Sequence, residues 1–192
     1  ELSKENLPTW ALEHMYPSLD DKTVEADLAQ AENACDAFVK AYEGKIPSLK
    51  ADELGQAIKD YEAIEGVLGK LGSYAQLIFA DDMDKPENAQ FYQNISEKLT
   101  VLGSQILFFG LHINKIDDAT MEAFKKESKL IAHFWPWLRD VRQYRPYQLD
   151  DQLEKLLHEK AVAGRSAWSR LFDESLGGLR FPYGKKGKKK AN

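Results

Sequence analysis

Residues 48–80 read SLKADELGQAIKDYEAIEGVLGKLGSYAQLIFA, and this stretch, predicted to be helical from Ser48 or Lys50 to about Ala80, decides the class of fold. Its apolar side chains recur at intervals of three and four residues, which is the period of one face of an α-helix. That face consists of Leu54, Ala57, Ile58, Tyr61, Ile64, Val67, Leu68, Leu71, Tyr74, Ala75 and Ile78. Since a helix with one long apolar face must cover it with other elements, the stretch predicts a helix packed within a bundle.

Three glycines stand in the middle of this predicted helix. Gly66, Gly69 and Gly72 lie three residues apart, and each costs up to ~1 kcal/mol of helix propensity relative to alanine. Glycines at this spacing share a face, which would let another helix approach closely. A kink or break near Gly72 is the alternative.

The same period continues along most of the chain. It predicts a helix from Thr23 to Tyr42, a third from about Pro86 to Asn114, a shorter one from Asp118 to Lys126, and a final long helix from Asp151 to about Asp173. Strict heptads are absent, which favours a globular bundle over a coiled coil. We therefore predict an all-α fold: a bundle of long antiparallel helices plus shorter helices, with a short extended C-terminal segment.

The end of the third predicted helix is apolar on most of its faces, through Ile106, Leu107, Phe108, Phe109, Leu111 and Ile113. Such a helix end is either buried or docked on another domain. If a partner domain is missing, we expect this surface to be partly exposed, or covered by a second copy of the chain in a homodimer.

The chain divides into two parts. Residues 1–175 are predicted to form one helical domain, and residues 176–192 an extended segment with a basic tail, because LGGLRFPY at 176–183 is rich in glycine and proline. The last eight residues, KKGKKKAN, carry five lysines, and a solvated end is the favoured interpretation. We expect this segment to act as a linker toward an absent catalytic domain.

Composition excludes several classes of function. The formal net charge is −5 although the tail is basic, so no basic face is available for nucleic acid. No apolar run approaches the roughly 20 residues that span a bilayer, and no leader sequence is visible at the N-terminus. A single cysteine, Cys35, cannot form an internal disulfide. We expect a cytoplasmic protein that contacts neither nucleic acid nor membrane.

The sequence contains fragments of catalytic and metal-binding motifs, but none of these motifs is complete. The stretch HEKAV at 158–162 begins like the zinc motif H-E-x-x-H but has Val162 where the second histidine belongs. No two of the four histidines lie four residues apart, the acidic turn at 81–84 lacks the rest of a calcium loop, and Gly164-Arg165-Ser166-Ala167-Trp168 lacks the second glycine of a nucleophile elbow. We therefore predict no catalytic residue and no metal ligand.

One cluster of arginines and aromatic residues remains. Arg139, Arg142 and Arg145 lie three residues apart, and Trp135, Trp137, Tyr144 and Tyr147 lie among them. Guanidinium groups stack on aromatic rings and bind carboxylates through two hydrogen bonds. The cluster could bind the C-terminus or acidic side chains of a peptide, or it could hold a domain interface together; packing is the favoured interpretation.

Three stretches carry a family resemblance. LRDVRQYRPYQL at 138–149, EKLLHEK at 154–160 and, most specifically, GRSAWSRLFDE at 164–174 resemble the N-terminal region of oligoendopeptidase F, a zinc metallopeptidase of the M3 family. Trp10, MYPSL at 15–19 and LGSYA at 71–75 resemble the opening segments of the same family, so the resemblance runs from about Trp10 to Phe181.

The resemblance implies a cytoplasmic zinc enzyme that hydrolyses short peptides inside an enclosed channel. Its H-E-x-x-H helix and third zinc ligand belong to a C-terminal catalytic domain and have no counterpart here. The chain alone is therefore expected to be inactive and without a cofactor, whereas the parent would hold zinc. In that family the N-terminal helices form one wall of the channel, so we expect the catalytic domain and an oligopeptide substrate as partners.

Eight residues are candidates for lining the channel or the domain interface: Arg139, Arg142, Tyr144, Arg145, Tyr147, His158, Arg165 and Trp168. The alternative function is a stand-alone helical protein that binds peptides or drives assembly, with the arginine and aromatic cluster as its site.

Overall fold

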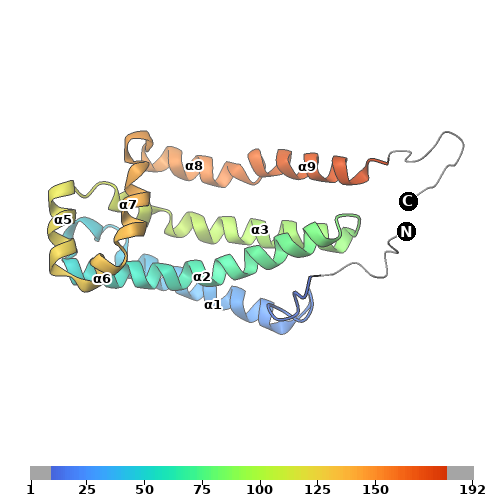
Figure 1. Ribbon diagram of the computed structural model, residues 1–192, viewed down its shortest axis with the longest axis horizontal. Helices are drawn as coiled ribbons and strands as arrows, with labels where there is room; N and C mark the ends of the chain where they lie inside the picture. Colours follow the sequence, from blue (N-terminus) through green and yellow to red (C-terminus); the bar gives the residue numbers. More distant parts are fainter. Residues whose placement is uncertain (1–9, 181–192) are drawn as a thin grey trace, which may run out of the picture.

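The computed structural model describes residues 10–180, and within that range the fold is all-α without a strand, as predicted. Three long helices, α1 (Lys22–Tyr42), α2 (Ala51–Asp81) and α3 (Pro86–Ile106), alternate in direction and form the bundle (Figure 1). A 3₁₀ turn, η2 (Ile46–Ser48), connects the first two. After a single residue, Leu107, the short helix α4 (Phe108–Ile113) follows α3.

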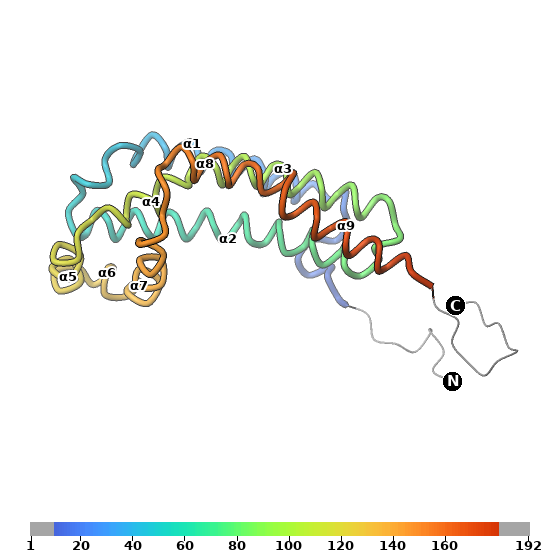
Figure 2. The backbone as a smooth tube through the Cα atoms, turned by 90° about the horizontal axis from the view of Figure 1, so that it is seen from above, coloured from blue at the N-terminus to red at the C-terminus, as the bar shows by residue number. Residues whose placement is uncertain are grey.

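The remaining elements form a cap and an outer layer. The cap at one end of the bundle consists of α5 (Asp118–Glu127), α6 (Lys129–His133) and α7 (Trp135–Gln143). The 3₁₀ turn η3 (Arg145–Tyr147) leads from the cap to α8 (Asp151–Ala161) and α9 (Arg165–Gly178). Figures 1 and 2 show α8 and α9 returning along α3 for most of the length of the bundle.

Side chains from the sequence define where the helices begin. Asp21 caps α1 by accepting the amide of Thr23 at 2.8 Å, and Asp117 caps α5 by accepting the amide of Thr120 at 2.9 Å. Asp150 accepts the amides of Gln152 and Leu153 at the start of α8, at 3.0 and 3.1 Å. An aspartate at this position satisfies amides that have no partner within the helix, and its charge is favourable at the positive end of the helix dipole.

The predicted face of α2 is buried between α1 and α3. Leu54, Ala57, Ile58, Ile64, Leu68, Leu71, Tyr74 and Ala75 are all buried. Phe109 of α4 is fully buried at one end of this core, where its ring lies edge-on to Phe38 of α1 at 5.1 Å and close to Tyr61 of α2, also at 5.1 Å. One continuous core therefore joins α1 to α4 and the cap, and a second cluster that includes Leu71, Tyr74 and Ala75 packs α2 against α1 and α3.

The predicted last helix is not continuous. It breaks between Ala161 and Arg165, where Gly164 has a backbone conformation outside the helical region and a Cβ on it would lie 2.9 Å from the carbonyl oxygen of Lys160. Beyond the break, α9 continues to Gly178, so the extended structure predicted from residue 176 is wrong for residues 176–178. The prediction for residues 181–192, including the basic tail, lies outside the described residues.

Of the three glycines in the middle of α2, one lies close to another helix as predicted. The helix runs unbroken from Ala51 to Asp81, and a Cβ on Gly66 or Gly69 would meet no atom within 4 Å. A Cβ on Gly72 would be 3.1 Å from Leu99 of α3. The closest approach is instead at Gly55, where a Cβ would lie 2.6 Å from the Cβ of Leu130 in α6.

The apolar end of the third predicted helix is mostly buried inside the chain. Ile106, Phe109 and Ile113 are at most 1% exposed, and Leu107, Phe108 and Leu111 are partly buried. The surface is therefore partly exposed, and its use in a homodimer stays a prediction. The large exposed apolar side chains lie elsewhere, mainly on α8 and α9.

None of the described helices is by itself both long enough and apolar enough to cross a membrane. By length and composition alone, residues 86–113 taken together with α5 pass the same test, with a bend of 98° between them.

Gly55 and Gly66 offer a matched test of this packing. We expect Gly55→Ala to lower the free energy of unfolding by about 1–3 kcal/mol, because the new methyl group collides with the Cβ of Leu130. Gly66→Ala should raise it by up to about 1 kcal/mol, because alanine is the better helix former and the space is open. Urea unfolding followed by circular dichroism measures both; effects of the same sign would contradict this packing.

Candidate functional site

Arg142, at the centre of the predicted arginine cluster, is occupied within the fold. Its guanidinium group donates to the carbonyl oxygens of Ile113 and Ile116 at 2.9 and 2.8 Å and also pairs with Asp118. The side chain is only 11% exposed. Its hydrogen bonds hold the pKa of the Asp118 carboxyl below its usual range, aided by the nearby charge of Arg145. Arg142 therefore joins α7 to the loop between α4 and α5.

The other members of the predicted cluster do not converge with Arg142 on one cavity. Arg145 reaches Asp118 at 3.2 Å, while Arg139 is exposed and pairs with its neighbour Asp140 at 2.9 Å. Tyr144 and Tyr147 are 72% and 80% exposed. Trp137 lies 5.9 Å from the ring of Tyr61, and Trp135 lies beneath the ammonium group of Lys125 at 4.0 Å. The cluster thus contains residues that pack within the fold, such as Arg142 and Trp137, and residues that are exposed to solvent. The exposed ones include Arg139, Tyr144 and Tyr147.

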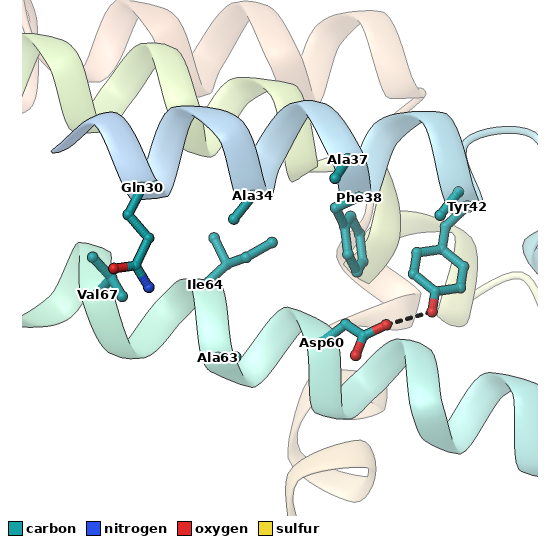
Figure 3. A pocket seen from close by; sticks show the side chains of 11 residues that line it. Gln30, Ala34, Ala37, Phe38, Tyr42, Asp60, Ala63, Ile64 and Val67 are labelled. Carbon is teal, nitrogen blue, oxygen red and sulfur yellow. Dashed lines mark hydrogen bonds between the residues drawn. The ribbon is translucent and has the colours of Figure 1, made fainter. Parts of the chain in front are cut away.

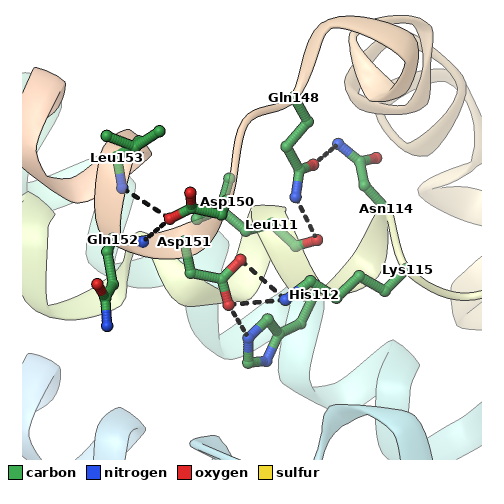
Figure 4. Close-up of polar contacts among 9 residues, drawn as sticks. All are labelled: Leu111, His112, Asn114, Lys115, Gln148, Asp150, Asp151, Gln152 and Leu153. Carbon is green, nitrogen blue, oxygen red and sulfur yellow. Dashed lines mark hydrogen bonds and ion pairs between the residues drawn. The ribbon is translucent and has the colours of Figure 1, made fainter.

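A polar network fixes the start of α8 to α4 (Figure 4). Lys115 binds both carboxylate oxygens of Asp151 at 2.8 and 2.7 Å, and Nε2 of His112 lies 3.0 Å from Oδ2 of the same group. The hydrogen bond from Lys115, with a smaller one from His112, lowers the pKa of Asp151. Beside it, Gln148 accepts from Asn114 at 2.9 Å and donates to the carbonyl oxygen of Leu111 at 3.2 Å.

His158 and Glu159 attach the middle of α8 to α3. Nε2 of His158 lies 3.3 Å from the carbonyl oxygen of Thr100. The same atom would be 3.1 Å from a Cβ on Gly103, so the glycine leaves room for the ring. Ser104 donates to the carboxylate of Glu159 at 2.8 Å. These two residues, which begin like a zinc motif in the sequence, thus join two helices. Within residues 10–180 no three His, Cys, Asp or Glu side chains are grouped as metal ligands would be.

α8 and α9 form hydrogen bonds and ion pairs with the bundle through polar side chains, although Val162 also lines a cleft with Val101 of α3, and their large apolar side chains are exposed. Asp151, His158 and Glu159 of α8 contact the bundle, and Arg180, just after α9, pairs with Asp84 at 3.1 Å. The opposite side, here called the outer face, has exposures of 45–72% and consists of Leu153, Leu156, Leu157, Trp168, Leu171, Phe172, Leu176 and Leu179. No residue of α8 or α9 is buried.

Covering the apolar side chains of the outer face would contribute a substantial free energy of stabilisation. Fully burying one such side chain stabilises by about 1.5–3 kcal/mol, and these eight are roughly half exposed, so covering them would contribute about 6–12 kcal/mol. That is comparable with the whole folding free energy of a typical domain, about 5–15 kcal/mol. A contiguous apolar surface of this kind marks an interaction site.

A second open region lies between α1 and α2 (Figure 3). This cleft of about 340 Å³ is lined mainly by small and apolar side chains, including Ala34, Ala37 and Ile64. Its acid, Asp60, already accepts a hydrogen bond from the hydroxyl of Tyr42 at 2.5 Å. Burial, together with that hydrogen bond, raises the pKa of Tyr42 to about 12. The cleft offers packing surface rather than reactive groups.

Another cleft lies between α9 and the end of the hairpin formed by α2 and α3. Arg165, one of the eight candidates, lines it. Trp168 lies on the outer face and His158 on the polar side of α8. The eight candidates are thus spread over α7, η3, α8 and α9. The leucines and Phe172 of the outer face were not among the predicted site residues, although their spacing of three and four residues indicates an amphipathic helix face.

A family model described as oligopeptidase F matches residues 112–181. Residues 112–181 are thus similar to the N-terminal domain of oligopeptidase F-like proteins. This confirms the resemblance for residues 112–181, whereas the resemblance of the segments between Trp10 and Ala75 stays a prediction. The match includes α5 to α9 and hence the whole outer face. No curated protein and no solved structure matches the chain.

Arg142 and Arg139 of this oligopeptidase F-like segment form a matched pair for mutation. We expect Arg142→Gln to lower the free energy of unfolding by about 2–3 kcal/mol, because it removes charged hydrogen bonds to two carbonyl oxygens in a largely buried place. Arg139→Gln should change it by less than about 0.5 kcal/mol, because that guanidinium is exposed. Urea unfolding measures the difference, and equal effects would contradict the assigned role of Arg142.

Proposed function

We propose that this chain is the non-catalytic N-terminal part of a zinc oligopeptidase that hydrolyses short peptides. In this proposal the outer face of α8 and α9 packs against the catalytic part of the enzyme. The domain then forms part of the wall of the substrate channel, limits the peptides that enter, and helps to orient the scissile bond. The helical domain would end at about Gly178, three residues later than the sequence suggested.

The observation that carries the proposal is the coincidence of the family match with the outer face. Residues 112–181 match oligopeptidase F, and the same residues place eight large apolar side chains in solvent. A helix pair that contacts its own bundle through polar groups and is apolar on the other side is suited to lie between two layers of protein. A catalytic domain is the partner that the family supplies.

The residues of this chain do not fit a zinc site of their own. His158 is the histidine that the sequence would suggest, but its Nε2 faces the carbonyl oxygen of Thr100, and Glu159 accepts from Ser104. A catalytic zinc needs three protein ligands. In the proposal, zinc and the general base therefore belong to the catalytic part, and Arg139, Tyr144, Arg145 and Tyr147 remain candidates for contact with that part or with substrate.

The alternative function is a stand-alone helical assembly or peptide-binding protein. The outer face favours assembly through a second copy, whereas the use of Arg142 within the fold weakens the arginine cluster as a peptide site. The reading frame that follows Asn192 separates the two functions. Our proposal predicts that it encodes an H-E-x-x-H motif; a stop codon without that motif would favour the alternative.

The full-length enzyme gives the functional test. We expect Trp168→Asp combined with Phe172→Asp to lower the hydrolysis of a quenched fluorescent peptide at least tenfold, because two side chains worth about 1.5–3 kcal/mol each no longer anchor the domain. Trp10→Asp is the control, since Trp10 is 53% exposed, lies outside the outer face, and should leave activity almost unchanged. Full activity in the double variant would contradict the proposal.

A further inference from the structure

We propose that the cleft between α9 and the α2–α3 hairpin binds a carboxylate carried on an apolar body. A free apolar carboxylic acid and the C-terminal end of a peptide with an apolar last residue share this chemistry. The inference stands on the geometry of the cleft and does not rest on the proposed function.

The cleft has two chemically different walls. Its volume is about 330 Å³, within the usual range of small-molecule sites. The α9 wall is polar, with Arg165, Ser166, Ser169 and Arg170. The hairpin wall is largely apolar and includes the rings of Phe79 and Tyr92, which stack nearly in parallel with centroids 5.1 Å apart and planes at 9°.

The charges in the cleft favour an anion. Two arginines and one acid, Asp173, line it, which leaves one positive charge in a chain of net charge −5. Arg165 has no carboxylate within 4 Å among residues 10–180, and Arg170 has only a loose contact of 3.6 Å with Glu174. A guanidinium group binds a carboxylate through two parallel hydrogen bonds, and the serine hydroxyls can donate to the same oxygens.

The opposite wall selects what the carboxylate is attached to. Tyr92, which is partly exposed and stacks on the buried Phe79, favours an aromatic or branched aliphatic group over a polar one. The cleft is also held at both ends: Glu159 of α8 is bound by Ser104 at 2.8 Å, and Arg180 after α9 is bound by Asp84 at 3.1 Å. Both walls are thus in place before a ligand arrives, which reduces the entropy cost of binding.

Isothermal titration calorimetry on the chain itself tests the site, with N-acetyl-L-phenylalanine as the probe and its C-terminal amide as the uncharged control. We expect saturable binding of the acid and binding at least about tenfold weaker for the amide, because the amide cannot form charge-assisted hydrogen bonds with the arginines. Phenylacetate and Ala-Ala-Phe separate the two sources: tighter binding of the peptide assigns the site to peptide ends, and equal binding assigns it to free acids.

The variants are chosen to leave the fold intact. Arg165→Gln with Arg170→Gln should weaken the acid at least about tenfold, Arg170→Lys should weaken it less, and Arg139→Gln on α7 should have no effect. Thermal unfolding shows whether each variant is folded. Equal binding of acid and amide, no saturation by the acid at 10 mM, or equal losses in the Arg139 control would each overturn the inference.

Discussion

The ion pair between Lys115 and Asp151, together with the hydrogen bond from Ser104 to Glu159, attaches α8 to the bundle by its polar side. This attachment determines which face of α8 is turned toward the bundle. Because the polar side of α8 faces α3, Leu153, Leu156 and Leu157 must face away from it. The helix that follows α8 keeps the same orientation beyond the break at Gly164, so the apolar stripe continues through Trp168 to Leu179.

The bundle itself does not need this layer. The core of α1 to α4 and the cap is closed by its own side chains, with Phe109, Ile113 and Leu138 fully buried. α8 and α9 add no buried residue to it. A layer that contributes little to the core yet presents so much apolar surface is suited to form another interface. In the oligopeptidase proposal that interface is with the catalytic part, and the cleft behind α9 lies on the opposite, polar side of the same helix.

Much of the fold could be predicted from the sequence because a single physical requirement determines it. The face of α2 had to be buried, and the period of its apolar residues identified that face correctly. The features that were missed depend on contacts between distant residues. The residues around Gly55 do not predict its contact with Leu130 of α6. The residues around Arg142 do not predict its hydrogen bonds to the carbonyl oxygens of Ile113 and Ile116. The spacing of α8 and α9 revealed two amphipathic helices, but which face would meet the bundle depended on Lys115 and Ser104, far away in the sequence.

Hydroxyl-radical footprinting with mass spectrometry, applied to the chain alone and to the full-length enzyme that the proposal expects, tests the central claim most directly. Trp168 and Phe172 are 72% and 62% exposed in the chain, so both should be labelled rapidly there. In the full-length protein we predict that both become protected several-fold, while Trp10, which is 53% exposed and lies outside the outer face, keeps its rate. Equal labelling of Trp168 and Phe172 in the two proteins would contradict the account, because the outer face would then remain in solvent.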